Sequence, residues 1–469
     1  MPESRSELRA DAIRIWMAGL EAVRSERLMR EAARVEGRTL VLGNDFRGLP
    51  EDALRIDLDG VRRIVVVGAG KAGAGMAAAL EEIFGPVLME AKQLGGWVNV
   101  PADCVKKLQR IQLHPARPAG VNEPTEEGVA GTGEILRMVE SLGPEDLCIA
   151  LISGGGSALM PVPIEGISLA DKLAVTRFLS AAGANIAELN TVRKQLSRVK
   201  GGGLARARRA GRLVTLIISD IPGDPLDLIA SGPTVPDAST PQDALAMLER
   251  FGASNGGIPA AVFAALEKKR GANVDRLQPL QSTKNFVIGN NDMAVAAAES
   301  EAKRLGYSTH ALCAVEPEGP VENIGQNLAS TALLTRRLIV EPNCWIRGGE
   351  GTVRLAPKGE RGLGGRNQQT VLAALIELTK RIQAAERPEE IVILSGGTDG
   401  EDGPTDAAGA FVDWAVIDEA KRRGLDAADF LRRNDAYHFF KPLGALIKTG
   451  PTQTNVSDVR VVLVENRSG

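Results

Sequence analysis

RIVVVGAGKAG, residues 63–73, is the stretch that decides the fold class of this 469-residue chain. Its β-branched run, Ile64 to Val67, predicts a buried strand, and the glycines that follow predict a tight turn. The next segment, MAAALEEIF, is rich in helix-forming residues and predicts a helix. A strand, a glycine turn and a helix in this order are typical of a parallel sheet with crossover helices.

The same order of strand, glycine turn and helix recurs along the chain. Further apolar runs are LCIALIS, RLVTLII, NFVIG from about Lys284, IVILS and VRVVLV. Because these strands are apolar without alternation, we expect sheets covered on both faces. The sequence therefore predicts an α/β fold with two layered domains and mainly parallel sheets. We expect a Rossmann-like domain over residues 1–280, a second α/β domain over 281–469, and a boundary region over 255–282.

Composition narrows the classes of partner. The chain has 56 Lys and Arg against 59 Asp and Glu, a net charge of −3, which gives no electrostatic footprint for nucleic acid. Its four cysteines lie far apart, so neither a disulfide framework nor a zinc site is indicated. No apolar run reaches the roughly 18 residues that a membrane span needs. We expect a cytoplasmic protein with small-molecule substrates and no nucleic-acid or membrane partner; the sequence leaves an oligomer open.

The first glycine turn matches the pattern G-x-G-x-x-G at Gly68, Gly70 and Gly73. This pattern after a strand is typical of dinucleotide sites, with Glu90 at the distance of the ribose-binding acid. A tight turn that serves packing alone is the other interpretation. Lys71 inside the turn is unusual for a dinucleotide site, but its ammonium group suits a phosphoryl oxygen.

A second glycine turn follows the strand LCIALIS. Its residues are Ser153, Gly154, Gly155, Gly156 and Ser157. Three consecutive glycines lose much conformational entropy on folding, which favours a contact with a closely approaching anion or nucleotide. The turn lacks the second glycine of a G-x-S-x-G nucleophile elbow. With only three histidines in the chain, a serine triad is disfavoured.

Two cations precede a third run of glycines. Arg193 and Lys200 are seven residues apart in a segment that predicts one helix running into Gly201, so we expect them on one helical face. They either contact substrate or phosphate, or belong to a solvated charged face.

Carboxylates gather after two predicted strands, Asp220 with Asp224 in one turn, and Asp399, Asp402 and Asp406 in the other. Hard carboxylates beside glycine turns suit Mg²⁺, which needs only one or two of them besides phosphate oxygens. The alternative is an Asp-rich turn with self-capping side chains.

Arg366 and Asn367 open a predicted helix after two glycines. The guanidinium of Arg366 would stand near backbone N–H groups that bind anions. A structural arginine held in salt bridges is the competing interpretation.

These motifs together resemble the class II glycerate kinases, whose second half is known as the MOFRL domain. The resembling segments run almost from end to end: VVVGAGKAGAGMA, LISGGGSALMPVP, LNTVRKQLSRVKGGGLA, LIISDIPGDPLDLIASGPTVPD, VIGNNDMAVAAA, GLGGRNQQ, LSGGTDGEDGPTDAAGAFVD and TGPTQTNVSDVRVVLV. The resemblance implies ATP- and divalent-metal-dependent phosphorylation of D-glycerate, commonly to 2-phosphoglycerate. It also implies two α/β domains with the active site in the cleft between them, which Lys71 and Arg366 would face. Arg117-Pro118 departs from the family pattern, which puts a role for the neighbouring His114 in doubt.

The hypothesis that follows is Mg-assisted phosphoryl transfer from ATP. Phosphates would contact Gly70 and the turn from Ser153 to Ser157, with Arg193, Lys200 and Asn367 as further binding residues. Lys71 and Arg366 would bind the γ-phosphoryl group or the glycerate carboxylate. Asp220, Asp399 and Asp402 are the candidate Mg²⁺ ligands, and Asp220 or Asp399 would orient or deprotonate the attacking hydroxyl group.

Two other functions remain in view. The first glycine turn is also compatible with an NAD(P)-dependent hydroxypyruvate reductase, although no histidine with a carboxylate partner is evident for proton transfer. A nucleotide- or hydroxy-acid-sensing protein without turnover is the non-enzymatic alternative.

Overall fold

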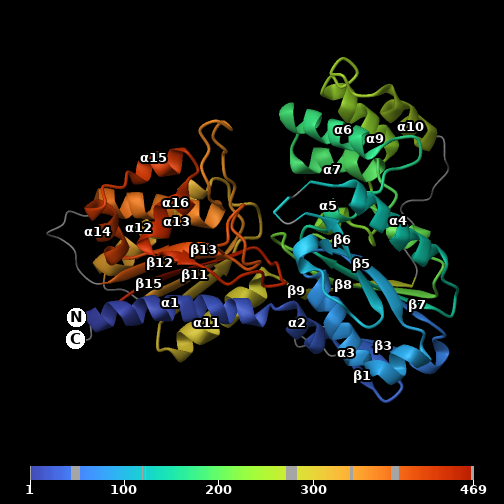
Figure 1. Ribbon diagram of the computed structural model, residues 1–469, viewed down its shortest axis with the longest axis horizontal. Coiled ribbons are helices and arrows are strands. Elements are labelled where there is room, and N and C mark those ends of the chain that lie inside the picture. The colour runs from blue at the N-terminus through green and yellow to red at the C-terminus, as the bar shows by residue number, and fades with distance from the viewer. Residues whose placement is uncertain are drawn as a thin grey trace. The chain divides into compact units, whose positions relative to one another are not determined.

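The computed structural model describes residues 2–43, 53–118, 120–121, 123–270, 282–338, 342–381 and 390–465, apart from the side chains of residues 2–6 and 336–338. It divides into two compact units (Figure 1). Residues 25–219 and 224–288 form the N-terminal unit. Residues 1–24, 220–223 and 289–469 form the C-terminal unit. The first helix and residues 220–223 therefore group with the second half of the chain, and the expected boundary near residue 280 stays a prediction.

The N-terminal unit is built on a six-stranded sheet in the order β6-β5-β4-β7-β8-β9. Its strands are β4 (Ile64–Ala69), β5 (Gly95–Pro101), β6 (Ile111–Arg117), β7 (Leu147–Ser153), β8 (Arg212–Ile218) and β9 (Thr283–Gly289). The five strands from β6 to β8 are parallel, which confirms the predicted parallel sheet. Counted from β4, the spatial order is 3-2-1-4-5-6, the doubly wound order of Rossmann sheets. The chain reverses its direction of winding between β4 and β7.

Glycine turns lead from these strands into helices as the sequence predicts. Helix α3 (Gly73–Ala91) follows β4, and the short helix α5 (Gly156–Leu159) follows β7. Helix α4 (Glu126–Glu140) follows β6 and is capped by Thr125, whose side chain accepts a hydrogen bond from the backbone N–H of Gly128. Helix α2 (Ser25–Ala32) and a small antiparallel sheet of β1 (Ala33–Glu36), β2 (Thr39–Leu42) and β3 (Leu54–Asp57) complete this part.

Four helices of the N-terminal unit gather in a cluster of their own (Figure 1). They are α6 (Leu169–Ala181), α7 (Ile186–Gln195), α9 (Pro241–Arg250) and α10 (Ala260–Arg270). Their apolar faces share one core, which includes Val175, Leu179, Val192, Leu248 and Leu266. Burial of these faces holds α6 and α7 against one another.

Two sequence expectations differ from the structure here. Helix α7 ends at Gln195 and α8 (Gly203–Ala207) starts anew, because Gly201 and Gly202 have φ angles of +54° and +75°. Ser197 also turns the chain, since its Oγ accepts hydrogen bonds from the N–H groups of Val199 and Lys200. Arg193 and Lys200 therefore do not share a helical face. In addition, β9, expected to start the second half, is the sixth strand of the first sheet; residues 271–281 of the expected boundary region lie outside the described residues.

The C-terminal unit contains a second six-stranded sheet in the order β10-β11-β15-β12-β13-β14. Its strands are β10 (Thr309–Cys313), β11 (Cys344–Gly349), β12 (Ile391–Gly397), β13 (Gly409–Val412), β14 (Leu446–Ile447) and β15 (Asp458–Val464). The prediction of a mainly parallel sheet is wrong for this unit: β10 and β11 are parallel, but β15 is antiparallel to both of its neighbours and β12 to β13. Residues 398–408 connect β12 to β13 by turns, without the crossover helix that a parallel pair requires.

Helices cover both faces of this second sheet (Figure 1). Helices α1 (Pro2–Ala22) and α11 (Asn291–Arg304) lie on one face. On the other lie α12 (Val321–Leu338), α13 (Arg366–Arg381), α14 (Trp414–Arg422), α15 (Ala427–Arg432) and α16 (Ala436–Phe440). Buried Trp16 of α1 donates a hydrogen bond of 3.2 Å to the carbonyl of Gly396. A Cβ atom at Gly396 would come within 2.7 Å of the Trp16 ring, so this contact requires glycine.

No helix in the described part of the chain has the length and apolar character needed to cross a membrane. None of the four cysteines, which all lie within the described ranges, forms a disulfide, and Cys148 and Cys344 are buried.

Candidate functional site

The two glycine turns predicted separately from the sequence form one structure. Strands β4 and β7 are neighbours, so their carboxyl ends lie side by side at the point where the winding reverses, the usual ligand position in such sheets. The N–H of Lys71 donates to the carbonyl of Gly154 at 2.9 Å, and the N–H of Ala72 donates to the Ser153 hydroxyl group at 3.0 Å. A Cβ atom at Gly70 would lie 2.0 Å from Ser153 Oγ, so only glycine permits this approach.

Gly155, in the second of the two glycine turns, lies beside two positively charged side chains. It has a φ of +77° and starts the short helix α5. A Cβ atom at this position would lie 3.4 Å from Arg117 Nη2 and 3.6 Å from Lys71 Cγ, so both side chains pass beside it. Arg117, the departure from the family pattern, thus lies next to the turn that the sequence assigned to phosphate.

Ser157 receives the two cations that the sequence singled out. Arg193 Nη2 donates to Ser157 Oγ at 3.0 Å, and Lys200 Nζ donates to the Ser157 carbonyl at 3.0 Å and also to its hydroxyl group. Burial, together with the charges of Arg193 and Lys172, lowers the pKa of Lys200 well below its ordinary value. The structure therefore brings together Lys71, the second glycine turn, Arg193 and Lys200; their roles in binding stay predictions.

Ser231 completes this group and was missed by the sequence analysis. Its hydroxyl group lies 3.1 Å from that of Ser157. Ala230 and Ser231 have φ angles of +50° and +63°, a left-handed conformation that is strained for residues other than glycine. The Ser231 carbonyl accepts the N–H of Gly201 at 2.9 Å, so the third glycine run fixes this strained turn. An Ala-Ser-Gly turn after a strand was the available signal in the sequence.

A cavity of about 380 Å³ borders this group. Ser157, Gly155, Arg193 and Lys200 line it, together with Lys172 of α6, which the sequence analysis also missed. Lys172 occupies the buried face of its helix with Leu169, Val175 and Leu179. A lysine at an apolar position of the helical period was the signal that could have revealed it.

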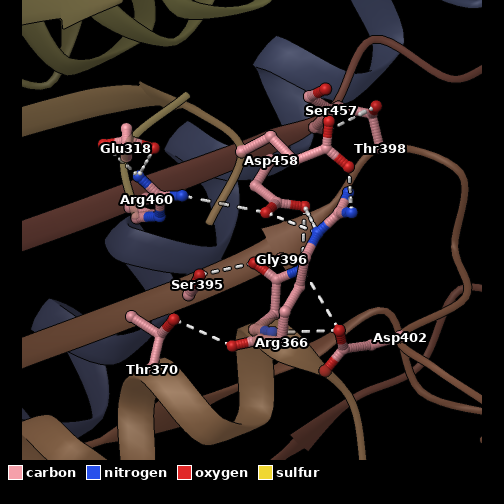
Figure 2. A network of polar contacts seen from close by, with 12 residues as sticks. Glu318, Arg366, Thr370, Ser395, Gly396, Thr398, Asp402, Ser457, Asp458 and Arg460 are labelled. Carbon is pink, nitrogen blue, oxygen red and sulfur yellow. Dashed lines mark hydrogen bonds and ion pairs between the residues drawn. The ribbon is translucent and has the colours of Figure 1, made fainter. Parts of the chain in front are cut away.

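In the C-terminal unit, Arg366 is the first residue of α13 and is held by two carboxylates, of which Figure 2 labels Asp458. Its Nε donates to Asp458 at 2.8 Å, and its Nη1 forms an ion pair with Glu350. Burial lowers the pKa of Arg366, but Asp458 and Glu350 outweigh it and raise that pKa above its ordinary value. Of the two sequence interpretations, the structure contains the salt-bridged arginine; binding of an anion by Arg366 stays a prediction.

Asp458 is shared by a second arginine (Figure 2). Arg460, 1% exposed, contacts Asp458 at 3.7 Å and Glu318 at 2.7 Å. Asp458 therefore lies between two guanidinium groups and is itself 2% exposed. Asp458, Glu350 and Glu318 escaped the sequence analysis because they are single acids outside any acidic cluster.

Asp402 and Asn367 cap the start of α13. The carboxylate of Asp402 accepts the N–H groups of Asn367 at 2.9 Å and Gln368 at 2.8 Å. Asn367 also donates to Asp458 at 2.9 Å. Burial raises the pKa of Asp402 to about 7, although these N–H groups favour its charged form. Both carboxylate oxygens are thus engaged with the helix, and a metal ligand role for Asp402, which stays a prediction, would compete with these bonds.

Asp220 and Asp399 both lie in the C-terminal unit. Asn455 Nδ2 donates to Asp220 Oδ2 at 2.9 Å, and the Ser457 hydroxyl group donates to the Asp220 carbonyl at 2.6 Å. Asp399 Oδ1 accepts the N–H of Glu401 at 3.1 Å. The loop 454–458 thus connects the surroundings of Asp220 with Asp458, the partner of Arg366.

A metal site made by the protein alone is not preformed in the described residues, where no group of three or more His, Cys, Asp or Glu could hold a metal ion. Mg²⁺ commonly uses one or two carboxylates with phosphate oxygens and water as its other ligands. A ligand role for Asp220 and Asp399 in such a site stays a prediction.

His114 has a structural environment. Its Nε2 lies 2.9 Å from the carbonyl of Glu127, and its ring packs on Trp97 with the ring centroids 5.1 Å apart. These contacts favour the interpretation of a satisfied loop histidine.

Comparison with known proteins supports the resemblance. Residues 11–267 match the domain of unknown function DUF4147, and residues 343–458 match the MOFRL family. A D-glycerate 2-kinase from Thermotoga maritima is 35% identical, with 89% of this chain and 94% of the relative covered. This chain belongs to the class II glycerate kinase family. A crystal structure of glycerate kinase from Thermotoga maritima matches with a TM-score of 0.79 at 33% identity, covering 98% of this chain and 100% of that chain.

Membership of the glycerate kinase family confirms the resemblance drawn from the glycine turns and the GGRNQ segment. The two matched regions also agree with two α/β units. A protein from Agrobacterium vitis named putative hydroxypyruvate reductase is 38% identical, with 86% of this chain and 87% of the relative covered. The cleft location of the active site stays a prediction.

Proposed function

We propose that this protein transfers the γ-phosphoryl group of ATP to D-glycerate and forms 2-phosphoglycerate. The observation that carries this proposal is the interlocked pair of glycine turns at the carboxyl ends of β4 and β7, with Lys71 beside Gly155. Backbone N–H groups of glycine turns at the start of a helix can bind phosphate. A lysine beside them can neutralise the negative charge of the phosphoryl group while it is transferred. The name of the Thermotoga relative, D-glycerate 2-kinase, supports the substrate and the position of transfer.

In the proposed reaction a hydroxyl oxygen of glycerate attacks the γ-phosphorus. The bond from γ-phosphorus to the β,γ-bridging oxygen breaks and ADP leaves, while the hydroxyl proton passes to a carboxylate, Asp220 or Asp399. Lys71 neutralises the charge on the transferring group, and the backbone around Gly155 and Gly156 holds the neighbouring phosphates. Arg366 orients an anionic group of a reactant from the start of α13.

Mg²⁺ is the metal proposed for this site, with Asp220 and Asp399 as its protein ligands. When bound, it would neutralise phosphate charge. We also propose a cytoplasmic location, because none of the four cysteines in the described ranges forms a disulfide.

The second candidate is an NAD(P)-dependent hydroxypyruvate reductase, favoured by the G-x-G-x-x-G turn after β4 and by the name of the Agrobacterium relative. A dinucleotide site would give no role to Lys71 or to the second glycine turn, and we therefore prefer the kinase.

Phosphorus NMR of the products formed from ATP, Mg²⁺ and D-glycerate tests the proposal. Formation of ADP with 2-phosphoglycerate is expected, and L-glycerate serves as the stereochemical control. In a parallel assay without ATP, NADH or NADPH absorbance is followed with hydroxypyruvate. Loss of that absorbance at enzymatic rates, without a phosphorylated product in the first assay, would establish the reductase in place of the kinase.

A further inference from the structure

Lys172 lines the cavity beside Ser157. The side chain is 9% exposed, and Nζ donates one hydrogen bond of 2.8 Å to the carbonyl of Pro161. An ammonium group has three N–H donors, so this bond satisfies only part of its capacity.

Lys172 is one of four cations that line this cavity. Arg193 and Lys200 both donate to Ser157. The fourth, Arg177, forms an ion pair of 3.0 Å with Glu123 at the exposed edge of the cavity. Among the described residues, Lys172, Arg193 and Lys200 form no ion pair with a carboxylate. The cavity therefore gathers basic side chains without matching carboxylates.

The charged groups that shift the pKa values of Lys172 and Lys200 are all positive. Arg193 approaches from α7, Lys200 from the loop after it and Lys269 from α10. Burial, with the charges of Arg193 and Lys269, lowers the pKa of Lys172 to about 7. A group in this position gains its proton readily once a negative charge enters the cavity.

Lys194 is a second buried lysine of the same unit, and the protein supplies carboxylates that balance its charge. It is 7% exposed and lies 3.4 Å from Asp227 and 3.5 Å from Asp237. Carboxylates of the protein thus balance Lys194, whereas within the described ranges Lys172 bonds to the backbone carbonyl of Pro161 and to no carboxylate. Uncompensated buried charge destabilises a fold, so its presence beside a cavity indicates that a ligand supplies the missing anion.

We propose that Lys172, Arg193 and Lys200 form an oxyanion-binding subsite around Ser157, which takes the carboxylate or a phosphate group of a reactant. The proposal rests on the proposed function only for the identity of the reactant. The oxyanion accepts N–H donors from the three side chains, and the apolar cavity wall excludes water around it.

A binding measurement independent of turnover provides the first test. Thermal unfolding of the full chain is followed with increasing sulfate against sodium chloride of equal ionic strength. Sulfate keeps its charge between pH 6 and 9, so it reports the protonation of the protein alone. We expect sulfate to raise the unfolding temperature at pH 6.5, with a smaller rise at pH 8.5 as Lys172 loses its proton.

Lys172→Met removes the charge and keeps the length of the side chain. We expect it to weaken sulfate binding at least tenfold and to abolish most of its pH dependence, while unfolding without sulfate occurs at an equal or higher temperature. The matched control is Lys268→Met, whose lysine is 75% exposed and pairs with Glu165. This control should behave as the original protein in every measurement.

Steady-state kinetics identify the source of the oxyanion. A rise in KM for D-glycerate with an unchanged KM for ATP assigns the carboxylate of glycerate, and the reverse assigns a phosphate of ATP. Sulfate binding and both KM values unchanged in Lys172→Met overturn the subsite. Absence of any turnover in the unmodified protein contradicts the proposed function instead, and the sulfate measurement still decides the subsite.

Discussion

Asn455 donates a hydrogen bond of 2.9 Å to the Oδ2 atom of Asp220, a residue 235 positions earlier in the chain. The Ser457 hydroxyl group also donates a hydrogen bond to Asp220, to the backbone carbonyl of that residue. The carboxylate of Asp220, which follows β8, is thus oriented by a loop of the C-terminal unit. Residues 220–223 belong to the same unit. Asn455 is a positioning residue for Asp220.

The first prediction concerns this pair. Asp220→Asn should raise the Mg²⁺ concentration for half-maximal rate or lower kcat by about 100-fold, since the amide is a poor ligand and base. Asn455→Ala should have a smaller effect of about 10-fold, because it removes only the orienting bond. Mg²⁺ titrations of the initial rate measure both. Asp292→Asn, at an exposed position in α11, is the control, and equal behaviour of all three variants would remove Asp220 from the metal site.

Lys71 provides the second prediction. Lys71→Ala should lower kcat by about 10²–10³-fold, because a positioned charge on the transferring group is lost. The glycine turns should keep their fold, since the substitution keeps the backbone N–H of residue 71, which donates to the Gly154 carbonyl. Initial rates with saturating ATP and D-glycerate give kcat, and circular dichroism reports the fold. The exposed Lys107→Ala is the control; near-normal turnover of Lys71→Ala would exclude the assigned role.

The third prediction separates structure from binding at Arg366. Arg366→Met leaves the carboxylate of Asp458, 2% exposed, with Arg460 at 3.7 Å as its remaining cation. The free energy of unfolding should fall by about 2 kcal/mol, less than for a fully buried pair because Arg366 is 30% exposed. In a unit of this size that corresponds to a drop of about 4–8 °C in Tm.

Differential scanning calorimetry measures this drop. Arg361→Met removes an exposed guanidinium that bonds the Ala356 carbonyl and should change Tm little. A large loss of activity in Arg366→Met with an unchanged Tm would show that Arg366 acts on a reactant alone and contributes no stability.

Asp402 supplies a fourth prediction. Asp402→Asn replaces one acceptor of the α13 cap by an amide donor that faces backbone N–H groups. We expect a loss of about 1–2 kcal/mol in the free energy of unfolding and an unchanged Mg²⁺ dependence. Urea denaturation and Mg²⁺ titration measure the two quantities. Asp406→Asn, an exposed partner of Lys448, is the comparison. A raised Mg²⁺ requirement in Asp402→Asn would favour the ligand role that the sequence suggested.

The fifth prediction is a pH dependence of stability. The folded pKa of Lys172 is about 7, whereas a lysine in the unfolded chain has a pKa near 10.4. Between these values the unfolded chain binds more protons, so stability relative to Lys172→Met should rise with pH. The slope should approach about 1.4 kcal/mol per pH unit and vanish below pH 7. Parallel denaturation curves of the two proteins from pH 6 to 10, in buffers without sulfate, phosphate or carboxylates, measure it, and a constant difference over that range would contradict the low pKa.

Local sequence was sufficient for β4, β7 and β8 and for the two glycine turns, but β5 and β6 were not among the predicted strands and β9 was expected in the second half. The run before Gly68 and the run before Gly154 are apolar enough to be buried strands, and their glycines allow the close approach that joins Lys71 to Gly154. The strand directions of the second sheet could not be predicted, because an apolar run does not indicate whether its strand is parallel or antiparallel to the neighbouring strands. Whether β15 runs parallel or antiparallel to β12 depends on the length and path of the connection between them.

The sequence by itself determined that this chain has α/β units, glycine turns after buried strands, and the motifs of the glycerate kinase family, because strand and turn propensities are local. Only the tertiary structure decided that Asp220 is oriented by Asn455, that Arg366 is balanced by Asp458, and that Lys172 stands without a carboxylate beside a cavity. The partners of a charged side chain come from strands and helices distant in sequence. Charge balance and burial are therefore properties of the packed fold.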